Sequence, residues 1–492
     1  MLSDSLSAHG APPFNDYPTV TELHSSARAF ASRHPGLCGV RRIGTSRAGE
    51  ELLLLSVGTP EARAPVAPAP VPAAAGPPAH VPRGAEAPAT AHDHRNVLVV
   101  AGPHANERVG GATVLRLAEH VVREKPLRAA GGRNVGWHFL LCLDPDGTRV
   151  NEGAGADTGN NTLHRYHRPF FRPAGAEQPE WSPSIVGTAE ETLPESRALQ
   201  TVIDELRPVL QCSLHANDVG GSWVQLTREV PGLPDPFAKS AADLGIPVEI
   251  GSIDTLYWPS PGPGVFVMPG PGVPERFASL QEDAARSTWY HPHRYGGMTA
   301  VIEAPMWASR LVDDCTPVPD PGRAVRGSAL RLRRRGRRVA ALLDRARPLV
   351  PAEHAPVLRG AEAAVQVCPG LADDWVRISR SPVGGARAVP GVPGVPAVPA
   401  LTAGHLASLA GVTWRIPLRA AAMVLGSLEG VPGRAARELR AELSGIVSAW
   451  CTAFECEFQT RWVAVDDQVR HQARTVIAVF ACLSESHGLG RP

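Results

Sequence analysis

The chain has 492 residues, more than one hydrophobic core ordinarily organises, so two or three folded units are expected. Its 49 basic residues nearly cancel 48 acidic ones, and the formal net charge of +1 argues against a surface built throughout for nucleic acid or anionic membranes. The 48 Gly and 49 Pro residues exceed average usage and gather in a few stretches, which is typical of linkers.

The N-terminal part begins with a predicted helix and two predicted strands. Residues 17–34 have apolar side chains at helical spacing after a Thr-rich start. Short apolar runs at 40–43 and 52–57, separated by a turn-prone segment, predict strands. Residues 59–95 are almost wholly Ala, Pro and Gly, which predicts a flexible insertion.

Strands and helices then alternate up to about residue 315. The apolar runs that predict strands are 97–101, 137–143, 209–214 and 299–302, and the predicted helices are 109–122 and 195–206. This alternation predicts an α/β fold, with a β-sheet flanked by helices. We therefore assign residues 1–58 and 96–315 to one predicted domain.

The remainder is predicted to be helical. Ten arginines on a helical pattern lie within 323–349, so 316–382 is a predicted Arg-rich helical region. A Pro/Gly/Val linker follows at 383–402, and 403–492 is a predicted α-helical C-terminal domain whose helices offer a surface for oligomerisation. One stripe of a long helix is predicted from apolar residues three or four apart: Leu443, Ile446, Trp450, Phe454, Phe458 and Trp462.

The residues that carry chemistry follow the predicted strands. His104 and Glu107 lie three apart in the turn after residues 97–101, and an imidazole and a carboxylate are ligands that zinc accepts. His215 follows the apolar run 209–214 and is the best third ligand. Glu303 follows 299–302, and a carboxylate there is unfavourable unless it is paired, metal-bound or engaged in proton transfer.

A structural interpretation of the same residues stays open. His104 and Glu107 can form a capping turn, and His215 can be a hydrogen-bonded core histidine. Glu303 can be a buried ion-pair partner. The zinc interpretation is favoured because two histidines, one glutamate and an open position form the set that a catalytic zinc needs.

Several features resemble the carboxypeptidase A-like zinc metallocarboxypeptidases. They are HxxE after a strand, a lone His after a later strand, a Glu ending a strand further on, the opening Y-P-T-x-x-E-L, the Asp-Pro-Asp-Gly run at 144–147 and the Pro-Glu-Ser-Arg run at 194–197. The resemblance covers roughly residues 17–58 and 96–310. It implies a mixed β-sheet flanked by helices and one zinc ion held by His104, Glu107 and His215.

The resemblance also implies roles in catalysis. Glu303 would be the general base, taking a proton from water and passing it to the leaving amine. The family's R-x-x-R pattern fits residues 165–168, so Arg168 is expected to stabilise the oxyanion, with Arg149 as the reserve. Arg165 and Arg149 are expected to bind substrate. The expected substrate is a peptide or an acylated amino acid.

One departure from the family affects specificity. The D-x-N-R-N-W segment, whose Asn-Arg pair grips a substrate's terminal carboxylate, is absent, and in its nearest match, residues 176–181, only the Trp persists. Arg172 is one substitute. The family's substrate-binding tyrosine has three candidates in Tyr257, Tyr290 and Tyr295.

Alternative functions follow from these features. The missing Asn-Arg pair favours considering a zinc N-acyl amino acid deacylase, which shares the ligand set. A less favoured alternative is an inactive, metallopeptidase-like binding protein, with the arginine run at 326–338 contacting nucleic acid. Because a block of like charge is more often a solvated helix face, no nucleic-acid partner is expected.

The cellular setting is predicted from three absences. Residues 1–17 show no signal-peptide pattern, and no apolar run approaches the roughly 20 residues of a membrane-spanning helix. The eight cysteines are scattered, and none forms a CxxC pair. We expect a reduced, cytoplasmic protein with no membrane partner.

Overall fold

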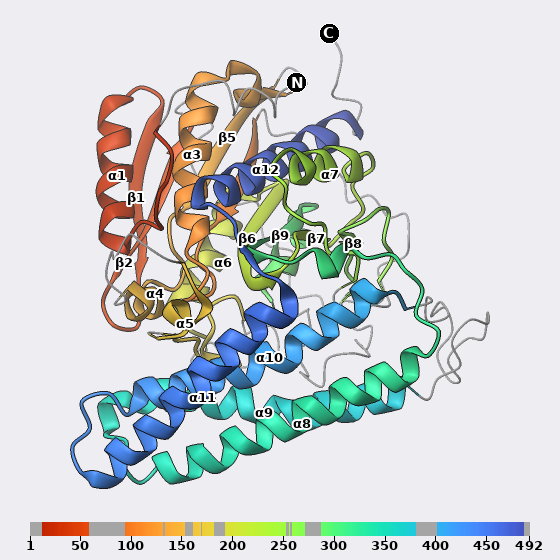
Figure 1. Cartoon of the computed structure of the whole chain (residues 1–492). Coiled ribbons are helices and arrows are strands. Elements are labelled where there is room, and N and C mark those ends of the chain that lie inside the picture. The colour runs from red at the N-terminus through yellow and green to blue at the C-terminus, as the bar shows by residue number, and fades with distance from the viewer. Residues whose placement is uncertain are drawn as a thin grey trace, which may run out of the picture.

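A computed structural model shows a helix-covered β-sheet and, beneath it in Figure 1, a bundle of long helices. The ranges described are 12–58, 94–130, 133–152, 161–168, 170–181, 192–251, 255, 258–270, 287–379 and 401–486. The predicted insertion at 59–95 and the predicted linker at 383–402 lie almost wholly outside these ranges.

The sheet is mixed, as predicted. The strand order is β1-β2-β5-β3-β6-β9-β7-β8. The central strands β5, β3, β6 and β9 are parallel to one another. On one side β2 is antiparallel to β5 and to β1, and on the other β7 is antiparallel to β9 and parallel to β8. The short β4 pairs with β5, and β10 pairs with β9. The strands are β1 Cys38–Thr45, β2 Glu51–Val57, β3 His94–Val100, β4 Ala129–Ala130, β5 Arg133–Leu140, β6 Leu210–Gly220, β7 Trp223–Leu226, β8 Val265–Val267, β9 Met298–Ala308 and β10 Arg461–Trp462.

Helices cover both faces of this sheet because side chains alternate along its strands. Leu53 and Leu55 of β2 pack in one core cluster with α1, α3, α7 and α12, whereas Leu54 packs against α6 on the opposite face. The helices around the sheet are α1 Val20–Arg33, α3 Val109–Arg123, α4 Pro145–Glu152, α5 Leu163–His167, α6 Pro194–Leu206, α7 Pro234–Asp243 and α12 Val465–Ser486. Thr19 and Glu22 form a capping box that begins α1.

The predicted helical region is present as the bundle of α8 Pro321–Ala346, α9 Ala355–Ile378, α10 Ala403–Ser427 and α11 Arg434–Phe458. These four helices are inserted between β9 and β10 of the sheet, and the chain then returns to the sheet as α12. Ala473, Val476 and Ile477 of α12 belong to the sheet's core cluster. The predicted boundary at residue 403 therefore does not separate two independent cores.

Three predicted elements end elsewhere in the structure. Strand β6 continues through His215 to Gly220, and β9 continues through Glu303 to Ala308, so both residues lie within strands that are hydrogen-bonded to each other beyond them. The predicted helical stripe ends at Phe458, because Gln459 adopts a left-handed conformation that closes α11. Trp462 lies in β10, opposite Trp307.

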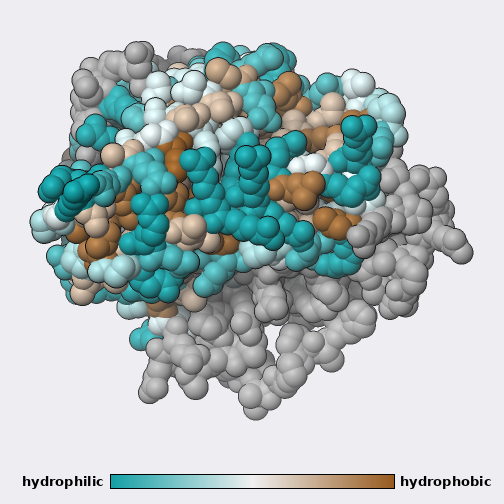
Figure 2. All heavy atoms as spheres, turned by 60° about the horizontal axis from the view of Figure 1, so that its bottom comes forward, coloured by the Kyte–Doolittle hydropathy of each residue, from teal (hydrophilic) through white to brown (hydrophobic). Residues whose placement is uncertain are grey.

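The arginines of α8 follow the predicted amphipathic pattern. Val325, Leu332 and Val339 are buried, whereas Arg326 and Arg334 are exposed. Figure 2 turns the lower side of the molecule forward and shows hydrophilic side chains over much of the visible face. Within the described ranges, no helix is long and apolar enough to cross a membrane.

Candidate metal centre

Neighbouring parallel strands bring the predicted ligands together. The loop after β3 carries His104 and Glu107, and β6, the next strand in the sheet, carries His215. Gly102 begins the loop with φ +59°, and a Cβ there would lie 2.8 Å from the Cys142 sulfur, so only glycine fits without strain. The chain thereby turns at the sheet edge where its polar side chains converge.

The three side chains form one compact cluster. The Nδ1 atoms of His104 and His215 are 3.1 Å apart, and each lies 3.0–3.1 Å from Glu107 Oε2. All three residues are buried. They form the one group of three or more potential ligands found in the part of the chain that the structure describes.

This donor set fits a zinc ion. Tetrahedral bonds of about 2.0–2.1 Å place neighbouring ligand atoms about 3.3–3.4 Å apart, close to the separations between these atoms. Two ring nitrogens facing each other share at most one proton in a neutral pair, whereas a cation satisfies both lone pairs. One carboxylate oxygen and two imidazole nitrogens leave a fourth position for water or substrate.

Glu180, which the sequence did not single out, holds His215 from the other side. Its carboxylate lies 3.2 Å from His215 Nε2, accepts a 2.7 Å hydrogen bond from Ser213, and accepts another from Trp289 Nε1. A proton on Nε2 leaves Nδ1 free to bind a metal, which is the usual role of a carboxylate behind a ligand histidine. Glu180 lies in the segment where the family's Asn-Arg pair is missing, directly before Trp181.

Arg172 is the cation that contacts the cluster. Its Nη1 donates to Glu107 Oε1 at 2.8 Å, which leaves Oε2 for a metal. Its Nη2 lies 3.0 Å from His104 Nε2 and 3.4 Å from Gln178 Oε1. When His104 binds a metal through Nδ1, its Nε2 carries a proton, which leaves Gln178 Oε1 as the acceptor that the described residues offer to Arg172 Nη2.

The two histidines titrate differently. Burial, assisted by the positive charge of Arg172, lowers the pKa of His104 to about 4, so this imidazole is neutral and able to act as a ligand. Burial also opposes a charge on His215, but the carboxylates of Glu180 and Glu107 outweigh it and raise the pKa of His215. Metal binding at His215 must therefore displace a proton.

Glu303 lies beside the cluster. It is the register partner of His215 on the adjacent parallel strand, and its Oε1 is 4.0 Å from His215 Nδ1. Its Oε2 is buried without a hydrogen-bond partner among the described residues. Burial, together with the nearby Glu107 carboxylate, raises the pKa of Glu303 to about 8. This carboxyl group is thus placed to exchange a proton with a molecule bound at the cluster.

The predicted arginines lie elsewhere. Arg149 pairs with Glu50 at 2.6 Å, and Arg168 is an exposed residue at the end of α5. Arg165 lines a cavity of about 90 Å³ that Asn106 also borders. None of the three makes a described contact with the cluster, whereas Arg172 does.

Two of the three candidate tyrosines lie within the described residues. Tyr290 donates to the carbonyl of Pro269, and Tyr295 donates to Asp204. Tyr257 lies outside the described residues.

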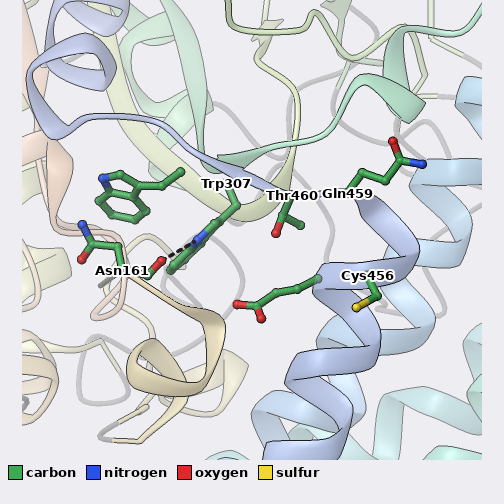
Figure 3. Close-up of a pocket in the computed structure, with 7 residues that line it drawn as sticks. Asn161, Trp307, Cys456, Gln459 and Thr460 are labelled. Atoms are coloured by element: carbon green, nitrogen blue, oxygen red, sulfur yellow. Dashed lines mark hydrogen bonds between the residues drawn. The ribbon is translucent and has the colours of Figure 1, made fainter. Parts of the chain in front are cut away.

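A larger cavity of about 310 Å³ lies where the bundle meets the sheet. Figure 3 shows Trp307 of β9 donating to the carbonyl of Asn161, with Cys456, Gln459 and Thr460 approaching from the end of α11. Its lining contains none of the three ligands, so this cavity is separate from the metal cluster.

Comparison with known families gives one match, to a family of zinc enzymes. Residues 23–223 match the family model described as zinc carboxypeptidase, a span that includes His104, Glu107 and His215 and ends before Glu303. The predicted resemblance to the zinc carboxypeptidases is thereby confirmed, and the match supports a metallopeptidase-like hydrolase. No match was found among curated proteins.

Two solved structures with some similarity to this chain are a metallo-carboxypeptidase and a carboxypeptidase A. A metallo-carboxypeptidase from Burkholderia cenocepacia is 18% identical, with a TM-score of 0.32 over 58% of this chain and 60% of that one. Carboxypeptidase A from Helicoverpa armigera is 16% identical, with a TM-score of 0.34 over 62% of this chain and 71% of that one. The present chain thus spans less than two thirds of the Burkholderia protein.

Proposed function

We propose that this protein is a zinc-dependent hydrolase that cleaves a peptide or peptide-like amide bond. The observation that carries the proposal is the convergence of His104, Glu107 and His215 within 3.1 Å of one another beside Glu303. One zinc ion bound there would polarise a carbonyl and lower the pKa of a coordinated water toward about 7.

Glu303 is the general base in this proposal. Its position on β9, level with His215 on β6, places its carboxyl group beside the cluster, 4.0 Å from His215 Nδ1. From there it can take a proton from water and deliver it to the leaving nitrogen. Replacing it removes proton transfer but none of the three ligands.

Glu303→Gln tests this role. We expect zinc content to stay at the wild-type level and kcat to fall by about 10²–10⁴-fold, because general acid–base catalysis contributes that much. Zinc content is measured with turnover on the same preparation. Wild-type kcat in Glu303→Gln would remove Glu303 from the mechanism.

Arg172 is our candidate for stabilising the oxyanion, in place of the expected Arg168. Its guanidinium already touches the ligand Glu107 and carries donors beyond those that this contact uses. We expect Arg172→Gln to lower kcat/KM by about 10²–10³-fold, the loss typical of one oxyanion donor, whereas the exposed Arg168→Gln serves as the matched control. A large loss of kcat/KM in Arg168→Gln, with little change in Arg172→Gln, would assign the oxyanion role to Arg168 instead.

A deacylase acting on N-acyl amino acids is the second candidate. The observation that favours it is the missing Asn-Arg pair, which grips the terminal carboxylate of a peptide in the carboxypeptidases. Parallel assays with C-terminal peptide substrates and N-acyl amino acids separate the two. Turnover of peptides alone supports the peptidase, and turnover of acyl amino acids alone supports the deacylase.

We also propose a reducing, cytoplasmic setting. None of the eight cysteines forms a disulfide in the structure, and five of them are buried. Buried cysteines without disulfides are usual in reducing compartments. Thiol titration of protein prepared without reductant is expected to find eight thiols after unfolding.

A further inference from the structure

The last helix of the chain connects the two segments that carry the candidate ligands. Gln472 of α12 is fully buried, and its Nε2 donates a 2.6 Å hydrogen bond to the backbone carbonyl of His215. Its Oε1 accepts a 2.8 Å hydrogen bond from the Thr113 hydroxyl. Thr113 lies in α3, which begins two residues after Glu107.

This connection lies where the sheet no longer joins the two segments. The described pairing of β3 with β6 ends at Val100 and Ser213, immediately before the chain reaches the ligands on either side. Beyond that point a single backbone hydrogen bond, from Ala216 to the Glu107 carboxylate, joins the ligands' own segments. The two hydrogen bonds of Gln472, to Thr113 and to the His215 carbonyl, add a second link between these segments. Neither of the groups involved is a candidate metal ligand.

Gln472 makes this link from the face opposite the site. Leu214 packs in the same core cluster as α12, so the next side chain along β6, His215, points to the other face of the sheet. Gln472 therefore supports the backbone of β6 from behind the ligand. Because Ala473 and Val476 are buried in that core cluster, α12 is a rigid support.

We propose that Gln472 is a positioning residue that fixes the separation between the His104–Glu107 loop and His215, and so raises metal affinity. The inference rests on the proposed function, because it assumes that these residues hold zinc. Residues behind metal ligands typically contribute 10–100-fold to affinity. The family match ends at residue 223, so it does not include this residue.

The same helix offers a matched control. Gln468 lies one turn before Gln472 and is equally buried; it donates to the Val463 carbonyl and accepts from the Tyr17 hydroxyl. Gln→Met at either position removes one donated and one accepted buried hydrogen bond while keeping the side-chain length. Only Gln472 contacts the ligand-bearing segments.

The experiment measures zinc affinity of the full chain by competition with a chromophoric chelator, for wild type, Gln472→Met and Gln468→Met. We expect the zinc dissociation constant to rise about tenfold or more in Gln472→Met and to stay within about twofold in Gln468→Met. The visible spectrum of the cobalt-substituted protein should change in Gln472→Met alone, because it reports ligand geometry.

The outcomes separate this inference from the proposed function. Zinc binding by wild type with equal affinity in both variants, or equal weakening in both, overturns the positioning role and leaves the metal centre standing. Wild-type protein that binds no zinc overturns both. If Gln472→Met does not fold, Thr113→Val breaks one arm of the link with an isosteric side chain, and unchanged affinity in that variant overturns the inference.

Discussion

Asp144 illustrates how one buried carboxyl group makes folding depend on pH. Its side chain is fully buried, its Oδ1 accepts a hydrogen bond from the Gly147 backbone N–H, and Arg47 lies 3.8 Å away. Burial outweighs these two contacts and raises the pKa of Asp144 to about 7 from its usual 3.8. The native state therefore holds this proton at pH values where the unfolded chain has released it.

The sign of the pH effect follows from this difference. Between about pH 4 and pH 7 the native state binds more protons than the unfolded state, so this residue's contribution to the free energy of unfolding falls as pH rises. We expect Asp144→Asn, which keeps the acceptor for Gly147, to reduce this decline by a few kcal/mol. Urea unfolding of both proteins at pH 5 and pH 8 measures it. An identical pH dependence in the two proteins would contradict the assignment.

At this same scale, the sequence predicted some site residues and missed others. His104, Glu107, His215 and Glu303 were predicted because each follows an apolar run at a sheet edge. Glu180 lies in a segment without helical or strand periodicity, so no pattern indicated its direction. Arg172 was named only as a substitute for the missing Asn-Arg pair, and not as a contact of the ligands. Gln472 follows no motif, and its contact depends entirely on how α12 packs.

Helix packing in the bundle depends on small residues at contacts. Gly336 of α8 faces α9, where an added Cβ would lie 2.8 Å from the Cys368 Cβ. Gly327, on the same helix, has only the Arg331 guanidinium within 4 Å, at 3.8 Å. One glycine thus allows close approach of two helices, and the other does not.

The two glycines give opposite predictions. Gly336→Ala should destabilise the protein by about 1–3 kcal/mol, because the contact must open to admit the methyl group. Gly327→Ala should stabilise it by about 0.5–1 kcal/mol, because alanine favours a helix interior more than glycine does. Chemical denaturation of both variants tests the pair, and destabilisation by Gly327→Ala would show that α8 packs differently.

Element types were more predictable than element ends. The helix at 109–122 and the strand at 52–57 appear as α3 and β2 almost without change, because their apolar periods are unambiguous. The ends of β6 and β9 were placed too early, because polar residues such as His215 look like the end of a strand. Strand β6 tolerates the buried side chain of His215 because Glu180 and Ser213 provide partners for it.

The bundle and the sheet share a hydrophobic core. Met306 and Ala216 of the sheet belong to one buried cluster with Leu418 of α10 and Phe454 of α11. A second cluster, which includes Leu332 and Trp375, lies within the bundle. The shared cluster couples the two parts energetically.

Unfolding should therefore be cooperative across the whole molecule. We expect calorimetry to show one transition, and Leu418→Ala, which removes a fully buried side chain from the shared cluster, to lower the midpoint of that single transition by an amount equivalent to about 2–5 kcal/mol. Two separate transitions would contradict the shared core, above all if Leu418→Ala lowered the midpoint of the bundle's transition and left that of the sheet unchanged.

The inserted position of the bundle could not be predicted from the sequence. Helical periodicity in 403–492 is the same whether a helix packs in a bundle or on a sheet, so the sequence did not indicate that α12 contributes to the sheet's core as well as to a cluster shared with the bundle. Only the tertiary contacts of Ala473 and Val476 with the sheet distinguish the two arrangements.

Zinc content is the most direct measurement of the central proposal, that His104, Glu107 and His215 bind one ion. Wild type, His215→Ala and His293→Ala are compared by elemental analysis; His293 is an exposed histidine that hydrogen-bonds Thr227 and lies outside the ligand set, so it serves as the control. We expect about one zinc per chain in wild type and in His293→Ala, and a loss of most of it in His215→Ala. About one equivalent retained in His215→Ala would contradict the proposed metal centre.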